Sequence, residues 1–222
     1  MTIKEKQAAL RLEMAARNVG AVVLPTGDPH LSEYIPAHWE SRRWFSGFTG
    51  DAGTLVITEN EALLWTDGRF FIQAAQQLAG TGIQLMRMRE PGVPTLPEWL
   101  SAHCGGTRVA LDGRLYSESA AEELETALQK SGASLVSMDL VSPVWKEDRP
   151  PLPATEVWLL EERFSGASCA EKLAAVRAEL KKVGAQAQFY SRLDAIAWAT
   201  NLRASDIAYN PFAIAYLLVT DK

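Results

Sequence analysis

One stretch near the amino end gathers most of the residues that could carry chemistry. It begins with Asp28, His30 and Glu33 and leads through an arginine pair into the glycine-rich run GFTGDAGT. Carboxylate oxygens and imidazole nitrogens suit a transition metal, so the first three residues are candidate ligands. No further carboxylate or histidine clusters beside them in the sequence. We therefore favour the simpler hypothesis that these three side chains cap a loop.

The glycine-rich run does not have the spacing of a nucleotide-binding loop. No lysine followed by Ser or Thr comes after its glycines, and the GxGxxG pattern is absent. Nucleophilic catalysis has little support either, because no GxSxG elbow occurs. Cys104 beside His103 lacks an evident third group to orient the pair. The sequence thus favours neither a nucleotide site nor a nucleophilic centre.

The composition limits the classes of molecule that this protein is expected to bind. The chain has 222 residues, of which 47% are hydrophobic and 22% charged, typical of a folded globular protein. Its net charge of -5, without a basic cluster, disfavours nucleic acid and anionic membranes as partners. Cys104 and Cys169 form no CxxC pair, and charges interrupt every apolar run at the amino end. We expect a cytoplasmic protein with free thiols.

Residue periodicity predicts alternating strands and helices in the first two thirds of the chain. Apolar residues at helical spacing predict helices over 3–18 and 69–79. Thr95 with Glu98, and Ser119 with Glu122, have the spacing of capping boxes that open two more helices. Short apolar runs predict strands at Ala21–Leu24, Gly53–Thr58, Ala62–Thr66, Ile83–Met88, Arg108–Leu111 and Ser134–Met138, the second and third forming a hairpin. This alternation implies an α/β sheet.

A proline-rich segment divides the chain. Three prolines at 150, 151 and 153 stiffen residues 149–155 as an extended linker between a first domain, 1–148, and a second, 156–222. Ser168 with Glu171 predicts another capped helix that ends near Gly184. A strand at Ala185–Tyr190, a helix at Leu193–Asn201 and a strand at Ala213–Thr220 follow. So few elements make a poor independent core. We therefore expect either that the chain is a fragment or that residues 156–222 pack on the first domain or on another copy of the chain.

Four blocks carry a resemblance to a known family. The stretches DPHLSEYIP, RRWFSGFTGDAGT, LLWTDGRFFIQAAQQL and RLDAIAWATNLRASDIAYNP resemble the N-terminal half of a cytosolic, three-domain Xaa-Pro aminopeptidase of the creatinase/prolidase family. The resemblance implies an α/β fold, with a mixed sheet flanked by helices in a ribonuclease-H-like topology, followed by an incomplete second domain of similar type. It also implies a peptide substrate with proline at its second position and a homodimeric or other homo-oligomeric assembly.

In this family a third, C-terminal domain supplies the ligands of two metal ions, usually manganese. A two-metal hydrolase needs several clustered carboxylates and a histidine, whereas this sequence has three scattered histidines and no such cluster. We therefore expect no catalytic residue and no metal ligand in this chain. The chain by itself should be catalytically inactive, and its expected contribution is substrate positioning and assembly.

Arg69 is the one candidate substrate-binding residue. The resemblance implies that the arginine of the WTDGRF block reaches toward the bound peptide, and a planar guanidinium can hold a carbonyl or carboxylate at fixed geometry. A purely structural interpretation is that Arg69 pairs with Asp67 or caps a helix. Farther along, the resemblance places a polar string at a domain junction, which Asp206 and Arg203 are expected to brace.

A second function class stays open. Histone-chaperone relatives of this fold use it for protein interaction without catalysis, so the chain could be a stand-alone interaction module. The WTDGRF block favours the peptidase ancestry, because an interaction module has no need of a peptide-binding arginine.

Overall fold

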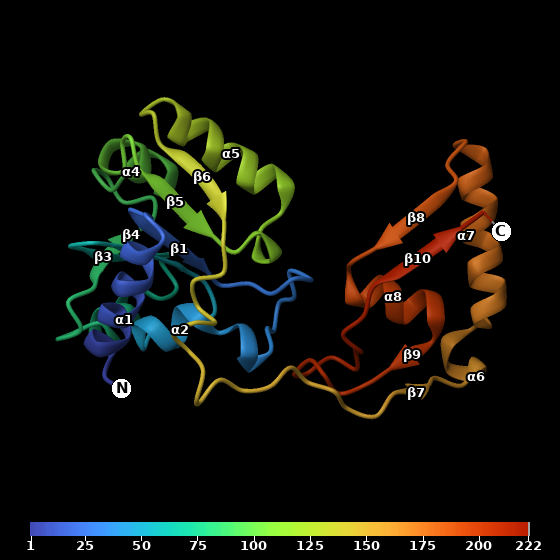
Figure 1. Cartoon of the computed structure of the whole chain (residues 1–222). Helices are drawn as coiled ribbons and strands as arrows, with labels where there is room; N and C mark the ends of the chain where they lie inside the picture. The colour runs from blue at the N-terminus through green and yellow to red at the C-terminus, as the bar shows by residue number, and fades with distance from the viewer. Residues whose placement is uncertain (222) are drawn as a thin grey trace. The chain divides into compact units, whose positions relative to one another are not determined.

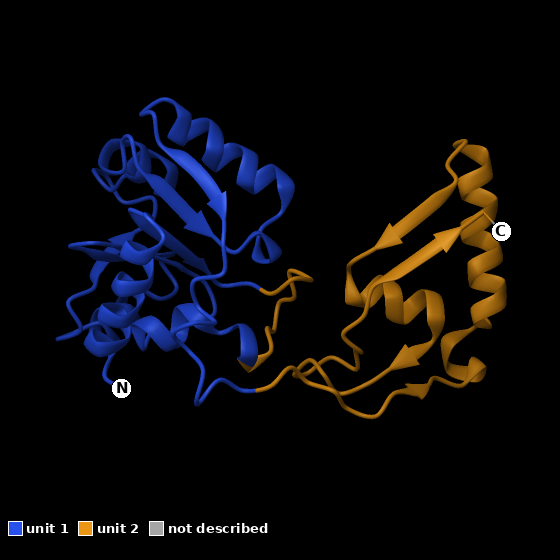
Figure 2. Cartoon of the chain, in the orientation of Figure 1, with its two compact units in different colours: residues 1–27, 38–150 blue, residues 28–37, 151–222 orange. Residues whose placement is uncertain are grey.

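A computed structural model describes residues 1–221 of the chain. The residues form two compact units, one made of 1–27 with 38–150 and the other of 28–37 with 151–222 (Figure 2). Each unit has its own sheet and its own buried apolar cluster. No helix within the described range is both long and apolar enough to cross a bilayer.

The first unit contains a mixed six-stranded sheet with the strand order β4-β3-β2-β1-β5-β6 (Figure 1). The strand β2 runs antiparallel to both of its neighbours, and the other three pairings are parallel. Five strands therefore end at one edge of the sheet, where β2 begins. The strands are β1 (Ala21–Pro25), β2 (Thr54–Thr58), β3 (Ala62–Thr66), β4 (Gln84–Arg87), β5 (Arg108–Leu111) and β6 (Ser134–Ser137).

Helices cover both faces of this sheet. Alternate residues of β1 point to opposite faces, so Val22 packs with one cluster and Val23 with the other. The first cluster includes buried residues of α1, α2 and α3, and the second includes buried residues of α4 and α5. The helices are α1 (Ile3–Ala16), α2 (Ser41–Ser46), α3 (Phe71–Gln77), α4 (Leu96–His103) and α5 (Glu118–Gln129), with short 3-10 turns η1 (Ala37–Trp39) and η2 (Gly113–Leu115).

This architecture confirms the predicted fold class, a mixed sheet flanked by helices. All six predicted strands of the first unit are present within a residue or two of their expected bounds, and β2 and β3 form the expected hairpin. The capping box at Thr95 and Glu98 is also confirmed. The box expected at Ser119 and Glu122 is wrong, because α5 already begins at Glu118 and its first turn is capped by Ser117.

The second unit has two small sheets and three helices. Strand β8 (Ala187–Tyr190) pairs antiparallel with β10 (Leu217–Thr220), and β7 (Trp158–Leu159) pairs with β9 (Leu202–Arg203). Its buried cluster is small and centres on Leu193 and Ile196 of α8 with Ile207. The predicted strand from Ala213 begins only at Leu217, because β8 offers it just four pairing residues. The helices are α6 (Glu162–Ser165), α7 (Cys169–Lys182) and α8 (Leu193–Thr200).

The predicted helix signals of this unit are largely confirmed, and Asp206 and Arg203 each bond groups within the unit. Ser168 and Glu171 form the expected capping box of α7. Asp206 does not pair with Arg203. Its carboxylate accepts hydrogen bonds from the backbone and hydroxyl of Thr155 and from the backbone of Ile214. Arg203 donates instead to the carbonyls of Ala197 and Leu202. A turn that supplies free backbone N–H groups attracts the aspartate more strongly than a distant guanidinium.

Candidate functional site

The edge of the first unit's sheet where five strands end carries the candidate site. Crevices at the carboxyl ends of parallel strands are common ligand sites in α/β proteins. Two identical tripeptides lie here: Asp67-Gly68-Arg69 follows β3, and Asp112-Gly113-Arg114 follows β5. We did not single out the second tripeptide from the sequence, although a search for repeated short motifs after strands would have found it.

Arg69 pairs with Asp67, which is the structural one of its two predicted alternatives. Its Nε and Nη2 donate to the two carboxylate oxygens of Asp67 at 2.9 and 2.8 Å, and its backbone N–H also donates to that carboxylate at 3.0 Å. This contact lowers the pKa of Asp67 and raises that of Arg69. The Arg69 side chain is nevertheless 67% exposed, and its guanidinium lies 5.1 Å from the Phe70 ring.

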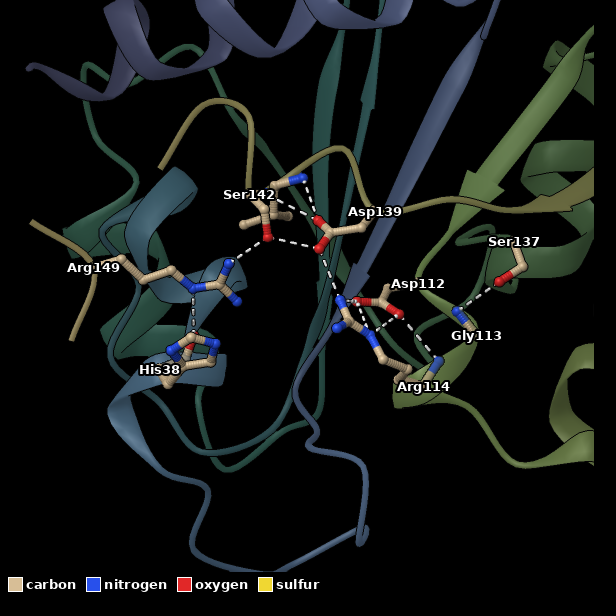
Figure 3. Close-up of polar contacts among 9 residues, drawn as sticks. His38, Asp112, Gly113, Arg114, Ser137, Asp139, Ser142 and Arg149 are labelled. Carbon is tan, nitrogen blue, oxygen red and sulfur yellow. Dashed lines mark hydrogen bonds and ion pairs between the residues drawn. The ribbon is translucent and has the colours of Figure 1, made fainter. Parts of the chain in front are cut away.

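Arg114 makes the same turn but is held more tightly, as Figure 3 shows. It donates to both oxygens of Asp112, and its Nη2 also donates to Asp139 at 2.7 Å. Ser142 donates two hydrogen bonds to Asp139, and Arg149 donates to the Ser142 hydroxyl. Burial of Asp139 opposes its charge, but the Ser142 and Arg114 contacts outweigh burial and lower its pKa.

This network fixes the segment that leaves the sheet after β6. Arg149 donates through Nε to the carbonyl of His38, and the His38 ring lies 2.8 Å from the carbonyl of Pro150. The guanidinium groups of Arg114 and Arg149 lie 5.1 and 5.7 Å from the Trp39 ring. All the charged groups of this network are therefore engaged within the chain. Its role is to brace the polypeptide. Arg69 is the more exposed arginine of the two tripeptides, at 67% against 52% for Arg114, and within residues 1–221 its guanidinium pairs with Asp67 alone.

The glycine-rich run forms a tightly held loop at the same edge. The backbone and hydroxyl of Thr26, next to β1, donate to the carbonyl of Gly53, and the Thr66 hydroxyl at the end of β3 donates to the carbonyl of Ala52. A Cβ on Gly53 would lie 2.8 Å from the carbonyl oxygen of Trp65. Glycine is required at this position because the loop lies directly against the β3 backbone.

A buried arginine holds the loop from beneath. Arg42, only 5% exposed, donates to the carbonyls of Phe48 at 2.9 Å and Gly50 at 2.6 Å. Burial lowers the pKa of this guanidinium to about 10, so it stays charged at neutral pH. The partners of Arg42 are thus backbone carbonyls and not a carboxylate. Its neighbour Arg43 does pair, with Glu40 at 3.2 Å.

The other sequence candidates do not assemble a catalytic centre. Within residues 1–221 no group of three or more His, Cys, Asp or Glu side chains is placed to hold a metal ion. Asp28 accepts hydrogen bonds from the backbones of His30 and Ser32, both at 2.9 Å, which confirms the loop-capping interpretation for Asp28. The His30 ring instead lies 2.7 Å from the carbonyl oxygen of Ser191. Burial raises the pKa of the Cys104 thiol to about 11, so at neutral pH it is not a thiolate nucleophile.

Comparisons with known proteins agree with this fold and these motifs. Two family models match, both described as the Creatinase/Prolidase N-terminal domain, one over residues 6–144 and the other over 148–222. The sheet with its helices and paired motifs is thus the amino-terminal α/β module of that group. The chain belongs to the creatinase/prolidase N-terminal domain family.

Several similar proteins are Xaa-Pro aminopeptidases. Aminopeptidase P2 of Arabidopsis thaliana is 40% identical over 225 residues, covering 99% of this chain and 32% of the relative. Human Xaa-Pro aminopeptidase 2 is 40% identical over 219 residues, covering 96% and 32%. A crystal structure of X-prolyl aminopeptidase from Caenorhabditis elegans, described as a cytosolic enzyme with a di-nuclear active site, aligns with a TM-score of 0.92 and 34% identity over 100% of this chain and 38% of that one. The chain spans about a third of the length of these relatives.

Proposed function

We propose that this chain is the non-catalytic N-terminal region of a proline-specific metalloaminopeptidase, whose reaction removes the residue that precedes proline. Similarity to Xaa-Pro aminopeptidases over nearly the whole chain carries this proposal. We propose a first domain at 1–148 and a second at 156–222, joined by 149–155. The compact units depart from these bounds, because residues 28–37 belong to the second unit.

Arg69 is the residue through which the chain contacts the peptide. It stands on a rigid frame, because Asp67 sets the turn that follows β3 and Arg42 holds the neighbouring loop. Its side chain is exposed, and Asp67 occupies only one edge of the guanidinium. The remaining N–H groups can donate to a peptide carbonyl or carboxylate at fixed geometry.

The metal chemistry belongs to the part of the relatives that this chain does not span. Residues 1–221 offer no cluster of ligands that fits a metal pair. The Caenorhabditis elegans relative is described as having a di-nuclear active site and as cytosolic. That likeness supports a two-metal site and a cytoplasmic location for the whole enzyme. From the family resemblance we propose manganese as the metal and a homo-oligomeric assembly.

Substitution of the equivalent arginine in a full-length Xaa-Pro aminopeptidase tests this function. Arg69→Lys keeps the positive charge but loses the planar guanidinium, so kcat/KM should fall. The loss of transition-state stabilisation calculated from that fall should be roughly 1 to 3 kcal/mol. Arg163→Lys is the matched control, because Arg163 also pairs with an acid two residues before it and is 69% exposed. Equal kinetics for the two variants would overturn the assignment of Arg69.

A further inference from the structure

Residues 28–37 form a folded segment of the second unit (Figure 2). The Asp28 carboxylate, only 1% exposed, accepts two backbone hydrogen bonds and closes a tight turn around His30. This turn holds the His30 backbone, so that the direction of its side chain is fixed as well.

The His30 ring is buried and held in one orientation. It is 8% exposed, its centroid lies 4.5 Å from that of the Tyr216 ring, and its Nδ1 lies 2.7 Å from the carbonyl oxygen of Ser191. A carbonyl can only accept, so Nδ1 carries the proton, and in the neutral ring Nε2 keeps its lone pair. Nε2 has no hydrogen-bond partner among residues 1–221.

His30 lines a cavity of about 230 Å³ within the second unit. Segment 28–37 forms one wall, the start of α8 another, and the loop before β10 the third. Pockets for drug-sized ligands measure about 300 to 1,000 Å³, so this cavity suits a smaller chemical group.

Three free acceptors line this cavity, beside the Ser32 hydroxyl and the Arg192 guanidinium. Besides His30 Nε2, these are the Glu33 carboxylate and the Asn210 Oδ1, neither of which has a partner among the described residues. Asp194 pairs with one edge of the Arg192 guanidinium through Nε and Nη2, at 3.3 and 3.2 Å. The side chains of Leu193 and Phe212 form an apolar part of the cavity wall. The lining thus has two carboxylates, Glu33 and Asp194, against one guanidinium, Arg192. This negative balance, with two further acceptors beside apolar side chains, matches a primary ammonium that carries a short apolar group.

We propose that this cavity binds the amino-terminal ammonium of a short peptide, with His30 Nε2 and Glu33 as its acceptors. The choice of a peptide as the carrier of the ammonium rests on the proposed function. The site itself stands on the second unit alone and is separate from Arg69.

Histidine-ring NMR of the whole chain tests the proposal. The chain has three histidines, so His30→Asn assigns the His30 signal, and the amide of this variant can still donate to Ser191. The probes are Ala-Pro-Ala and its N-acetylated form. We expect a saturable shift of the His30 signal with the free peptide, and at least about tenfold weaker binding of the acetylated peptide, the loss expected for a missing hydrogen bond to a charged group.

Two exposed carboxylates make the matched variants. Glu33→Gln should weaken the binding of Ala-Pro-Ala about tenfold, whereas Glu59→Gln should leave the His30 shift unchanged. Equal binding of both peptides, no shift at all, or an unchanged affinity in Glu33→Gln would overturn the proposal. If the His30 shift is found but Arg69→Lys leaves catalysis of the full-length relative intact, the role of Arg69 fails and this site stands. If Arg69→Lys impairs catalysis but no His30 shift is found, only this site is overturned.

Discussion

Arg69 and Arg114 make the same turn with the aspartate two residues before them, yet their surroundings differ. Arg114 also donates to Asp139 and lies over Trp39, whereas the Arg69 side chain is mostly exposed. An exposed ion pair contributes at most about 1 kcal/mol to stability, so the Asp67–Arg69 contact can open without unfolding the unit. The residues around a motif, more than the motif itself, separate a bracing arginine from an available one.

Two glycines beside Arg69 differ in the space around them. Gly53→Ala should destabilise the chain by about 1 to 3 kcal/mol, because the new Cβ would lie 2.8 Å from the carbonyl of Trp65. Gly68→Ala should stay within about 0.5 kcal/mol, since the nearest atom would be 3.9 Å away. Denaturant unfolding of both variants measures this difference. Equal stability would contradict the described packing of the loop.

The Asp139 carboxylate should give the first unit a pH-dependent stability. Its pKa is lowered in the folded chain, so its stabilisation is present above the unfolded value of about 3.9 and is lost as pH falls through the folded value. Asp139→Asn should therefore be less stable by about 1 kcal/mol at neutral pH, and the difference should shrink below about pH 4. Denaturant unfolding at several pH values checks this. A difference that persists unchanged at pH 3, or that is also seen in Asp51→Asn, would contradict it.

At the scale of elements, the sequence predicts a strand or helix correctly where the residues of that element themselves carry its pattern. Short apolar runs gave the six strands of the first unit, and Thr95 with Glu98 gave the start of α4. The helix α2 was missed, because its six residues have no side-chain cap and are stabilised by burying Phe45 and Arg42. Burial of this kind depends on distant parts of the chain and leaves no local pattern.

The same limit applies to the candidate site. The WTDGRF block drew attention to Arg69, but its bidentate contact with Asp67 was only one of two alternatives. The partners of Arg42 were not predictable, because carbonyl acceptors carry no sequence signal. The cavity beside His30 likewise joins residues 28–37 to residues more than 150 positions away.

The cap of α5 offers a sharp test at this scale. Ser117→Ala should cost about 0.5 to 2 kcal/mol, because its hydroxyl accepts the backbone N–H of Ala120. Ser119→Ala should cost less, since Ser119 lies inside the first turn and its hydroxyl meets only that of Ser117. Thermal unfolding of the two variants measures the difference. A larger loss in Ser119→Ala would mean that the helix begins later than described.

At the scale of the whole molecule, the chain has two folded units, and the sheet of the first unit presents Arg69. The described residues lack the ligand cluster that a two-metal hydrolase requires. Holding a peptide and cutting it are therefore separate tasks in this account. We propose that the chain performs the first, and that the part of its relatives that it does not span performs the second.

A hydrolysis assay of the purified chain tests this separation most directly. The chain is incubated with Ala-Pro-Ala and manganese, and release of free alanine is followed beside a full-length Xaa-Pro aminopeptidase as positive control. The account predicts no release above buffer. Turnover that copurifies with the chain through several columns and persists after controls for contaminating peptidase would contradict it.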